Sequence, residues 1–284
     1  RDLKIPKKGP IRILDLGSGS GASGLACLFL LRHWRIENPI SLEAWDYSSK
    51  SLGILKSLHR ACPDLWPDSK VMTKRKDLRY ALSKEDSRQF DLVVMSFSLN
   101  EILESEENEQ KLVWLDQITQ YLKPNGFLII LEPAEAETCN NLQESSRILT
   151  EGSPQLYQHG PYFNGLPCPL VTNKSKYYSH EVRRLLPTRT MLKINAPLRL
   201  ETREIKFGIS ILGKQRAMPF PEAHSPCRLV SPVKKSKGVV FFIAIGADGQ
   251  EYRFELQRRD LSKEETTDLL ELERGDILEL GIGE

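Results

Sequence analysis

Residues 11–24 read IRILDLGSGSGASG, an apolar run that ends in an acid and is followed by four glycines within eight residues. The apolar run predicts a buried β-strand, and the glycines predict a tight turn into a helix. Helix N-termini expose unpaired N–H groups, and glycines let a ligand approach the backbone closely. The stretch therefore predicts a nucleotide-binding turn, although a simple strand-to-helix turn explains the glycines equally well.

The first half of the chain alternates between apolar, β-rich runs and helical patterns. Strand candidates such as residues 11–16 and 126–133 are apolar on both faces, as in a sheet that helices cover on both sides. We therefore expect an α/β fold with a Rossmann-like parallel sheet. The strand candidates are residues 11–16, 41–48, 71–78, 90–99 and 126–133, and the helix candidates are residues 23–34, 50–62 and 108–122.

After residue 133 the pattern loosens. We expect a helix over residues 138–150 and a loop insertion over about 152–190. Residues 198–206 and 207–214 predict an antiparallel strand pair that completes the sheet. These segments and the preceding ones make up a predicted first domain over residues 1–215.

A proline-punctuated linker, MPFPEAHSP, precedes a small basic β-rich domain that we predict over residues 216–284. Residues 238–246 and 251–259 flank an Asp-Gly turn and predict a hairpin. Ser262 and Glu265 predict a capping box for a short helix, and residues 276–281 predict a closing strand. An OB-like barrel and a bare β extension explain this strand count equally well.

Three acids lie at the ends of three successive predicted strands. Asp15 precedes Gly17 by two residues, where its carboxylate can face an amino group. Asp46 lies where a carboxylate can hold both ribose hydroxyls, and Asp77 lies where it can accept from an adenine amino group. The carboxyl ends of parallel strands meet at one edge, so the three acids are expected to converge on one crevice. Each could instead be a loop residue or a cap, and Ala22 at the third glycine position of GxGxxG keeps a nicotinamide ligand open.

Basic residues are concentrated in one part of the chain. The formal net charge is +2, but residues 174–237 hold fifteen Lys and Arg against four Asp and Glu. A phosphate backbone would exploit this asymmetry, because neutralised phosphates release counterions. A solvated basic face without a partner is the alternative.

Four stretches together, DLGSGSG, AWDYS, FDLVVMSFSLNEI and YLKPNGFLIILEP, resemble the class I S-adenosylmethionine-dependent methyltransferases over residues 11–133. FSLNE, LPCPL, KFGISILGK and RLVSPVKKSKG resemble more narrowly the methyltransferase-like small-ribosomal-subunit assembly proteins of mitochondria and bacteria. The resemblance implies S-adenosylmethionine as cofactor, with Asp15 and the glycines on its methionine part and Asp46 on its ribose. The predicted cofactor-binding residues are Asp15, Gly17, Ser18, Gly19, Gly21, Asp46, Tyr47, Asp77 and Ser96.

The resemblance also implies a partner, small-subunit ribosomal RNA or the assembling small subunit. The residues predicted to bind RNA are Lys174, Lys176, Arg183, Arg184, Lys234, Lys235 and Lys237. Some members of the narrower family hold an iron–sulfur cluster on four cysteines. This chain offers only Cys168 and Cys227 at the corresponding places, with His180 as a weak substitute, so we expect no cluster and no other metal.

The catalytic groups are less clearly marked. Methyl transfer needs aligned reactants more than a nucleophilic side chain, and no cysteine follows the fourth strand to attack a pyrimidine ring. Asn100 and Glu101 are the predicted catalytic residues, although Asn100 could equally cap a helix. Glu132 could orient a substrate amine or serve as a rigid turn carboxylate.

Two functions from different classes follow. The first is an S-adenosylmethionine-dependent methyltransferase that acts on small-subunit ribosomal RNA during ribosome assembly. The second is a non-catalytic RNA-binding assembly factor that retains the cofactor fold. The longest apolar stretch, residues 25–31, is too short for a membrane span, and five cysteines without a CxxC pair favour the cytoplasm or alternatively the mitochondrial matrix. The chain begins at Arg1, so we expect further residues to precede it.

Overall fold

The structure is a computed structural model that describes residues 9–80, 89–102, 108–152, 156–163, 165–218 and 226–279. The chain forms two compact units. Unit 1 comprises residues 1–132, 145–160 and 210–218, and unit 2 comprises residues 133–144, 161–209 and 219–284. The predicted boundary between a first domain and a C-terminal domain, at residues 215 and 216, stays a prediction.

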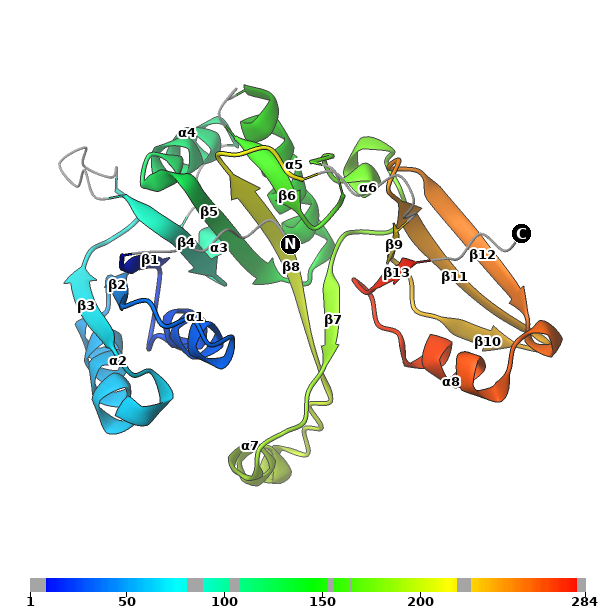
Figure 1. The fold of residues 1–284 in the computed structure, drawn as a ribbon, viewed down its shortest axis with the longest axis horizontal. Coiled ribbons are helices and arrows are strands. Elements are labelled where there is room, and N and C mark those ends of the chain that lie inside the picture. Colours follow the sequence, from blue (N-terminus) through cyan, green and yellow to red (C-terminus); the bar gives the residue numbers. More distant parts are fainter. Residues whose placement is uncertain are drawn as a thin grey trace. The chain divides into compact units, whose positions relative to one another are not determined.

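In the described part of the chain the larger sheet has eight strands, in the order β3-β2-β1-β4-β5-β8-β6, with β7 paired to β8 outside this path (Figure 1). Its parallel strands are β1 (Ile11–Leu16), β2 (Ile40–Asp46), β3 (Ser69–Arg75), β4 (Phe90–Ser96) and β5 (Leu122–Pro133). The predicted Rossmann-like α/β fold is confirmed.

Helices and short helical turns follow these strands. The four helices predicted over residues 23–34, 50–62, 108–122 and 138–150 end within three residues of the predicted positions, and two short elements over residues 63–65 and 99–102 were not predicted. The elements are α1 (Ala22–His33), α2 (Ser49–Ala61), η1 (Pro63–Leu65), α3 (Leu99–Ile102), α4 (Asn108–Thr119) and α5 (Ala136–Gly152). The Ser48 hydroxyl caps α2 by accepting from the backbone N–H of Ser51. Residues 123–126, Lys-Pro-Asn-Gly, belong to the start of β5, where the pairing with β4 shifts register between Phe90 and Leu92.

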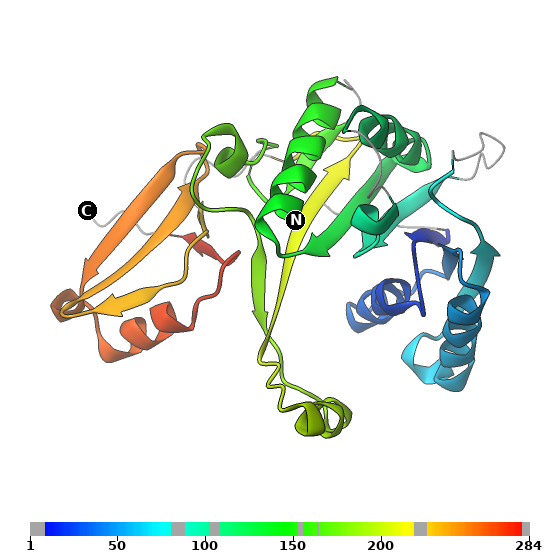
Figure 2. The same cartoon turned by 180° about the vertical axis from the view of Figure 1, so that it is seen from behind.

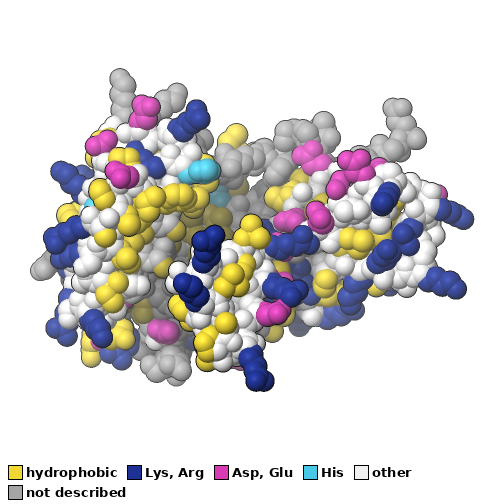
Figure 3. Space-filling view, turned by 90° about the horizontal axis from the view of Figure 1, so that it is seen from below, with side chains coloured by type: hydrophobic (Ala, Val, Ile, Leu, Met, Phe, Trp, Pro, Cys, Tyr) yellow, Lys and Arg dark blue, Asp and Glu magenta, His cyan; other side chains and the backbone are white. Residues whose placement is uncertain are grey.

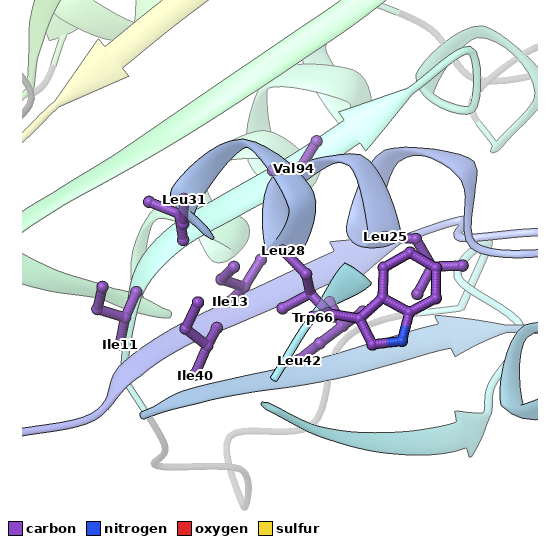
Figure 4. Close-up of a cluster of buried hydrophobic side chains, with 9 residues drawn as sticks. All are labelled: Ile11, Ile13, Leu25, Leu28, Leu31, Ile40, Leu42, Trp66 and Val94. Carbon is purple, nitrogen blue, oxygen red and sulfur yellow. The ribbon is translucent and has the colours of Figure 1, made fainter. Parts of the chain in front are cut away.

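The core that positions the glycine turn lies between α1 and the strands β1, β2 and β4. Leu25, Leu28 and Leu31 recur at helical spacing and pack on strand residues such as Ile13 and Leu42 (Figure 4). Burial of this apolar stripe holds the first turn of α1 against the end of β1.

Residues 204–213 form one continuous strand, β8 (Glu204–Gly213), and not the predicted antiparallel pair of residues 198–206 with 207–214. β8 pairs antiparallel with β6 (Tyr157–Gly160) through its second half and with β7 (Glu181–Arg184) through its first half. The expected partner, residues 198–206, instead begins at the last residue of a 3-10 turn, η2 (Ala196–Leu198), and includes only the start of β8.

Unit 2 also holds an antiparallel sheet at the C-terminal end. Its strands are β9 (Pro226–Leu229), β10 (Lys234–Ser236), β11 (Val239–Gly246), β12 (Glu251–Gln257) and β13 (Ile277–Glu279), with the turn η3 (Arg258–Asp260) and the helix α8 (Lys263–Glu271). The predicted hairpin of β11 with β12, the capping box of Ser262 with Glu265 and the closing strand are confirmed. Among the described residues the pairings make an open sheet, with β12 and β13 not joined to close a barrel.

The remaining elements of unit 2 are α6 (Pro169–Thr172) and α7 (Arg189–Asn195). Within the described residues, no helix combines the length and the apolar character needed to cross a bilayer.

Candidate cofactor and methyl-transfer site

The glycine turn after β1 has the backbone geometry that its sequence predicts. Gly17, Gly19 and Gly21 have φ values of +68°, +53° and +89°, which side chains rarely allow. A Cβ on Gly17 would lie 2.4 Å from the Ser98 Cβ, and one on Gly21 would lie 2.5 Å from Leu55. A Cβ on Gly19 would meet no atom within 4 Å, so open space adjoins this residue alone of the three.

Asp46 ties the glycine turn to the end of β2. Its Oδ2 accepts a 2.8 Å hydrogen bond from the backbone N–H of Gly19, and its Oδ1 accepts a 2.7 Å bond from that of Ser48. The backbone N–H groups of Gly17 and Ser18 donate to the carbonyl oxygen of Trp45 at 2.9 and 3.1 Å. The turn is therefore held in shape by the neighbouring strand.

Asp15 lies inside the fold. It is fully buried, and its carboxylate accepts hydrogen bonds of 2.9 Å from the Ser23 hydroxyl and 2.8 Å from the Gly24 N–H. Burial is the main cause that raises the pKa of this carboxyl to about 6. These hydrogen bonds hold the start of α1 against the end of β1. Asp15 is not among the lining residues of the cavity beside the glycine turn.

A cavity of about 550 Å³ opens beside this turn in unit 1. It joins the ends of β1, β2, β3 and β4, as expected for a parallel α/β sheet. Its lining residues are Gly17, Gly19, Asp46, Tyr47, Ser48, Ser51, Lys76, Asp77, Leu78, Arg79, Phe97, Ser98, Glu101 and Ile102.

The cavity brings together six of the predicted site residues: Gly17, Gly19, Asp46, Tyr47, Asp77 and Glu101. Four others lie near it in sequence but outside its lining, namely Ser18, Gly21, Ser96 and Asn100. Ser18 is buried, and its hydroxyl has no hydrogen-bond partner in the described structure. Buried polar groups are usually hydrogen-bonded, so an unpartnered hydroxyl between the cavity-lining Gly17 and Gly19 is unusual.

Asp77 is engaged by a neighbouring cation. Arg79 donates from Nε at 3.0 Å and from Nη2 at 2.6 Å to the two carboxylate oxygens. These hydrogen bonds are the first cause that holds the pKa of Asp77 below its usual value. An adenine amino group would have to share Asp77 with Arg79.

The sequence analysis did not predict the lining residues Arg79, Ser48 and Ser51, although each lies within five residues of a predicted strand end.

The segment after β4 forms another part of the cavity wall. Phe97 has a φ of +54°, rare for an aromatic residue, and its ring is 45% exposed. Its N–H donates to the Leu131 carbonyl oxygen at 2.8 Å, while the Ser98 hydroxyl donates to that of Leu16 at 3.0 Å. These bonds hold the segment against both β5 and β1.

Glu132 caps the short helix α3 from the end of β5. Its Oε1 accepts a 2.9 Å bond from the N–H of Leu99, whereas its Oε2 is buried and has no partner in the described structure. Burial is the largest cause that raises the pKa of Glu132 to about 7. The expected capping role of Asn100 is wrong, because α3 begins at Leu99 and the Glu132 carboxylate supplies the cap.

Comparison with known proteins identifies the domain that contains this cavity. Residues 3–181 match a profile described as a methyltransferase domain. The chain belongs to this methyltransferase domain family. Comparison with curated protein sequences finds no match.

Several solved structures are similar to this chain. TehB from Haemophilus influenzae is 14% identical, with a TM-score of 0.43, over 72% of this chain and 58% of that chain. An rRNA methylase from Streptococcus thermophilus is 9% identical, with a TM-score of 0.37, over 73% of this chain and 88% of that chain. TrmN from Thermus thermophilus is 16% identical, with a TM-score of 0.40, over 73% and 45%. This chain thus spans less than two thirds of the length of TehB and TrmN.

A methyltransferase domain implies S-adenosylmethionine as cofactor, and the residues present fit it. The open space at Gly19 and the Asp46 carboxylate, both at the cavity wall, suit a ligand that carries both hydroxyl and amino groups. The fit rests on these features of the cavity.

The cations predicted to bind RNA lie in unit 2 and divide into two groups. Arg183 forms ion pairs with Glu181 and Asp276, and Arg184 pairs with Glu273. The other predicted cations, Lys174, Lys176, Lys234, Lys235 and Lys237, are exposed, as is Arg184.

The residues considered as metal ligands in this chain are separated. Cys168 packs in an apolar cluster with Tyr162, and Cys227 packs in a different cluster with Phe242. The Nε2 of His180 contacts an Nη of Arg274 at 2.8 Å, and burial lowers the pKa of this imidazole to about 4. Within the part of the chain that the structure describes, His, Cys, Asp and Glu form no group of three or more placed to hold a metal ion.

Proposed function

We propose that this chain is an S-adenosylmethionine-dependent RNA methyltransferase that acts on small-subunit ribosomal RNA during ribosome assembly. The observation that carries the cofactor part is the Gly19–Asp46 hydrogen bond at the wall of the cavity in a methyltransferase domain. The proposal of an RNA substrate rests on the sequence resemblance and on exposed lysines outside residues 185–203, namely Lys174, Lys176, Lys234, Lys235 and Lys237.

Asp46 is the residue that we assign to the ribose hydroxyls. Each of its oxygens accepts one backbone N–H, which leaves further lone pairs for hydroxyl donors. Gly17 and Gly19 allow close approach of the methionine part, and Tyr47 and Leu78 supply apolar surface for the adenine. When bound, S-adenosylmethionine supplies the methyl group on its sulfonium.

Glu101 and Phe97 are the residues that we assign to the acceptor side of the cavity. The exposed Glu101 carboxylate can accept a hydrogen bond from an acceptor amine and orient its lone pair. The described lining includes no cysteine, so addition of a thiol to a pyrimidine ring finds no support here. An amine or oxygen acceptor is therefore favoured over a ring carbon.

The second candidate, a non-catalytic assembly factor that binds RNA, is favoured by the position of Asn100. This residue lies in α3 and outside the described cavity lining, which leaves Glu101 as the one predicted catalytic residue there. For either function we propose the cytoplasm as the compartment, with the mitochondrial matrix as the alternative.

Two measurements test the proposal. Titration calorimetry with S-adenosylhomocysteine should show binding to the wild type and at least about tenfold weaker binding to Asp46→Ala, with exposed Asp64→Ala as the matched control. Undiminished binding by Asp46→Ala contradicts the cofactor assignment.

The second measurement is transfer of a labelled methyl group to assembling small subunits. Label should enter the ribosomal RNA with the wild type and with Asp64→Ala, and should be lost with Asp46→Ala. Cofactor binding without RNA labelling would favour the non-catalytic candidate.

A further inference from the structure

A hairpin-like arm extends from the paired strands β7 and β8 within unit 2. It comprises residues 185–203 and includes α7 and η2 (Figures 1 and 2). Its backbone is closed on itself, because Leu185 donates to the carbonyl oxygen of Arg203 at 2.8 Å and Leu200 to that of Asn195 at 3.2 Å. The Thr188 hydroxyl caps α7 by accepting from Met191. The arm is therefore an ordered projection.

The apolar side chains of the arm are largely exposed in the described structure. None of the side chains of residues 185–203 is buried. Leu186 is 93% exposed, and Leu192, Ile194, Leu198 and Leu200 are between 54% and 63% exposed. Single exposed leucines are ordinary, but a contiguous set on one small element marks an interaction site.

The arm is also strongly basic. It carries four cations and one carboxylate, and that carboxylate, Glu201, pairs with Arg203. Arg189, Lys193 and Arg199 form no ion pair with a described residue. Figure 3 views the arm end-on, with apolar and basic side chains next to one another on its surface.

We propose that the arm is a docking segment for an acidic protein partner that has an apolar groove. The aliphatic side chains would fill the groove, and Arg189, Lys193 and Arg199 would face carboxylates on its rim. This combination of an apolar centre and complementary charged edges is typical of protein interfaces.

The composition of the arm favours a protein over the other possible occupants. A phosphate backbone would match the cations but would leave five aliphatic side chains against water. Unpaired bases stack on flat rings, and residues 185–203 contain no aromatic residue. Contact between the arms of two copies would bring like charges together.

The test is site-specific photocrosslinking of the full chain in its native cells. p-Benzoyl-L-phenylalanine replaces Leu186 or Leu198, with replacement of exposed Leu65, which lies in η1, as the control position. We expect one protein adduct of discrete mass from both arm positions and not from position 65. Its crosslinked peptide should contain both acidic and apolar residues.

Charge reversal within the arm supplies a second measurement. Arg189→Glu together with Arg199→Glu should lower the adduct yield about tenfold or more, the loss expected when ~1.4 kcal/mol of interface energy is removed. The thermal unfolding midpoint should not change, because the two side chains are exposed. Binding of S-adenosylhomocysteine should not change either.

Each other outcome overturns the proposal. An adduct removed by ribonuclease identifies RNA as the occupant, and an adduct of twice the chain mass identifies a second copy. No adduct, or a yield that survives charge reversal, shows that the arm does not dock on an acidic protein. These outcomes are independent of cofactor binding and of methyl transfer, so failure here is distinct from failure of the proposed function.

Discussion

Asp46 at the end of β2 accepts a 2.8 Å hydrogen bond from the backbone N–H of Gly19, 27 residues earlier in the chain. The carboxylate therefore shapes the glycine turn and lines the cavity at once. Replacing Asp46 would therefore change both the free energy of unfolding and the affinity for cofactor. Substitutions of the neighbouring glycines separate these two effects better.

Gly17 and Gly19 offer a matched pair for that separation. A methyl group on Gly17 would collide with Ser98, and φ is positive, so Gly17→Ala should lower the free energy of unfolding by roughly 2–4 kcal/mol. Gly19→Ala meets open space and carries only the backbone strain, about 1 kcal/mol. Its methyl group would enter the cavity and weaken S-adenosylhomocysteine binding about tenfold or more. Urea unfolding and calorimetry check both variants, and equal stability losses would contradict the prediction.

Glu132 should make stability depend on pH. Its folded-state pKa of about 7 lies above the ordinary value of 4.5, so the folded protein keeps a proton that the unfolded chain has lost. This contribution is present below about pH 4.5 and is lost as pH rises to about 7. Glu132→Gln removes the titration but keeps an oxygen for the Leu99 N–H.

The difference in free energy of unfolding, wild type minus Glu132→Gln, should fall by up to roughly 3 kcal/mol from pH 4.5 to pH 7.5. Asp15, whose pKa is also raised by burial, is present in both proteins and cancels from this difference. Urea unfolding at several pH values measures it. A difference that stays constant with pH would show that Glu132 does not titrate in this range.

Glu101 should affect methyl transfer more than cofactor binding. If its carboxylate orients the acceptor, Glu101→Gln lowers the rate of transfer about 100-fold or more and leaves S-adenosylhomocysteine affinity unchanged. Asn100→Ala, outside the described lining, should have the smaller effect on the rate. A larger loss with Asn100→Ala would reverse the assignment.

Glu181 and Glu201 form contrasting ion pairs. Glu181 and Arg228 are both buried and paired, so Glu181→Ala leaves a buried cation uncompensated and should cost about 3–5 kcal/mol. Glu201 pairs with Arg203 on the exposed arm, and Glu201→Ala should cost about 1 kcal/mol or less. Denaturant unfolding of both variants provides the comparison. Similar losses would show that burial does not govern the Glu181 pair.

Lys234, Lys235 and Lys237 are exposed and available to a polyanion. Their combined change to Gln should weaken binding of small-subunit ribosomal RNA and lower the slope of log affinity against log salt by about 2 to 3. The control changes three exposed lysines of unit 1, Lys50, Lys56 and Lys70, to Gln. RNA affinity that does not weaken with added salt would contradict the electrostatic argument.

The glycine turn and the strands around it could be predicted because their signals are local. The apolar run of β1, the glycines after it and the acid that ends β2 each lie within a few residues in sequence. Parallel pairing then brings the strand ends together as a general property of the fold.

Other features depend on residues far apart in sequence. Asn100 has the side chain of a helix cap, but the group that caps α3 is Glu132, 33 residues from Leu99. The sequence pattern predicts a break between residues 206 and 207, whereas in the structure β8 continues through this point and each of its halves pairs with a different strand. Such pairings are decided by tertiary packing rather than by the local pattern.

Asp15 illustrates how a conspicuous acid beside a glycine turn can mislead a mutational scan. Its carboxylate bonds to Ser23 and Gly24 and stays out of the cavity, so replacing it would first unfasten the start of α1. A variant at this position that no longer binds cofactor would reflect a distorted glycine turn and not the loss of a contact to the cofactor. A thermal unfolding measurement on the same variant would distinguish the two causes.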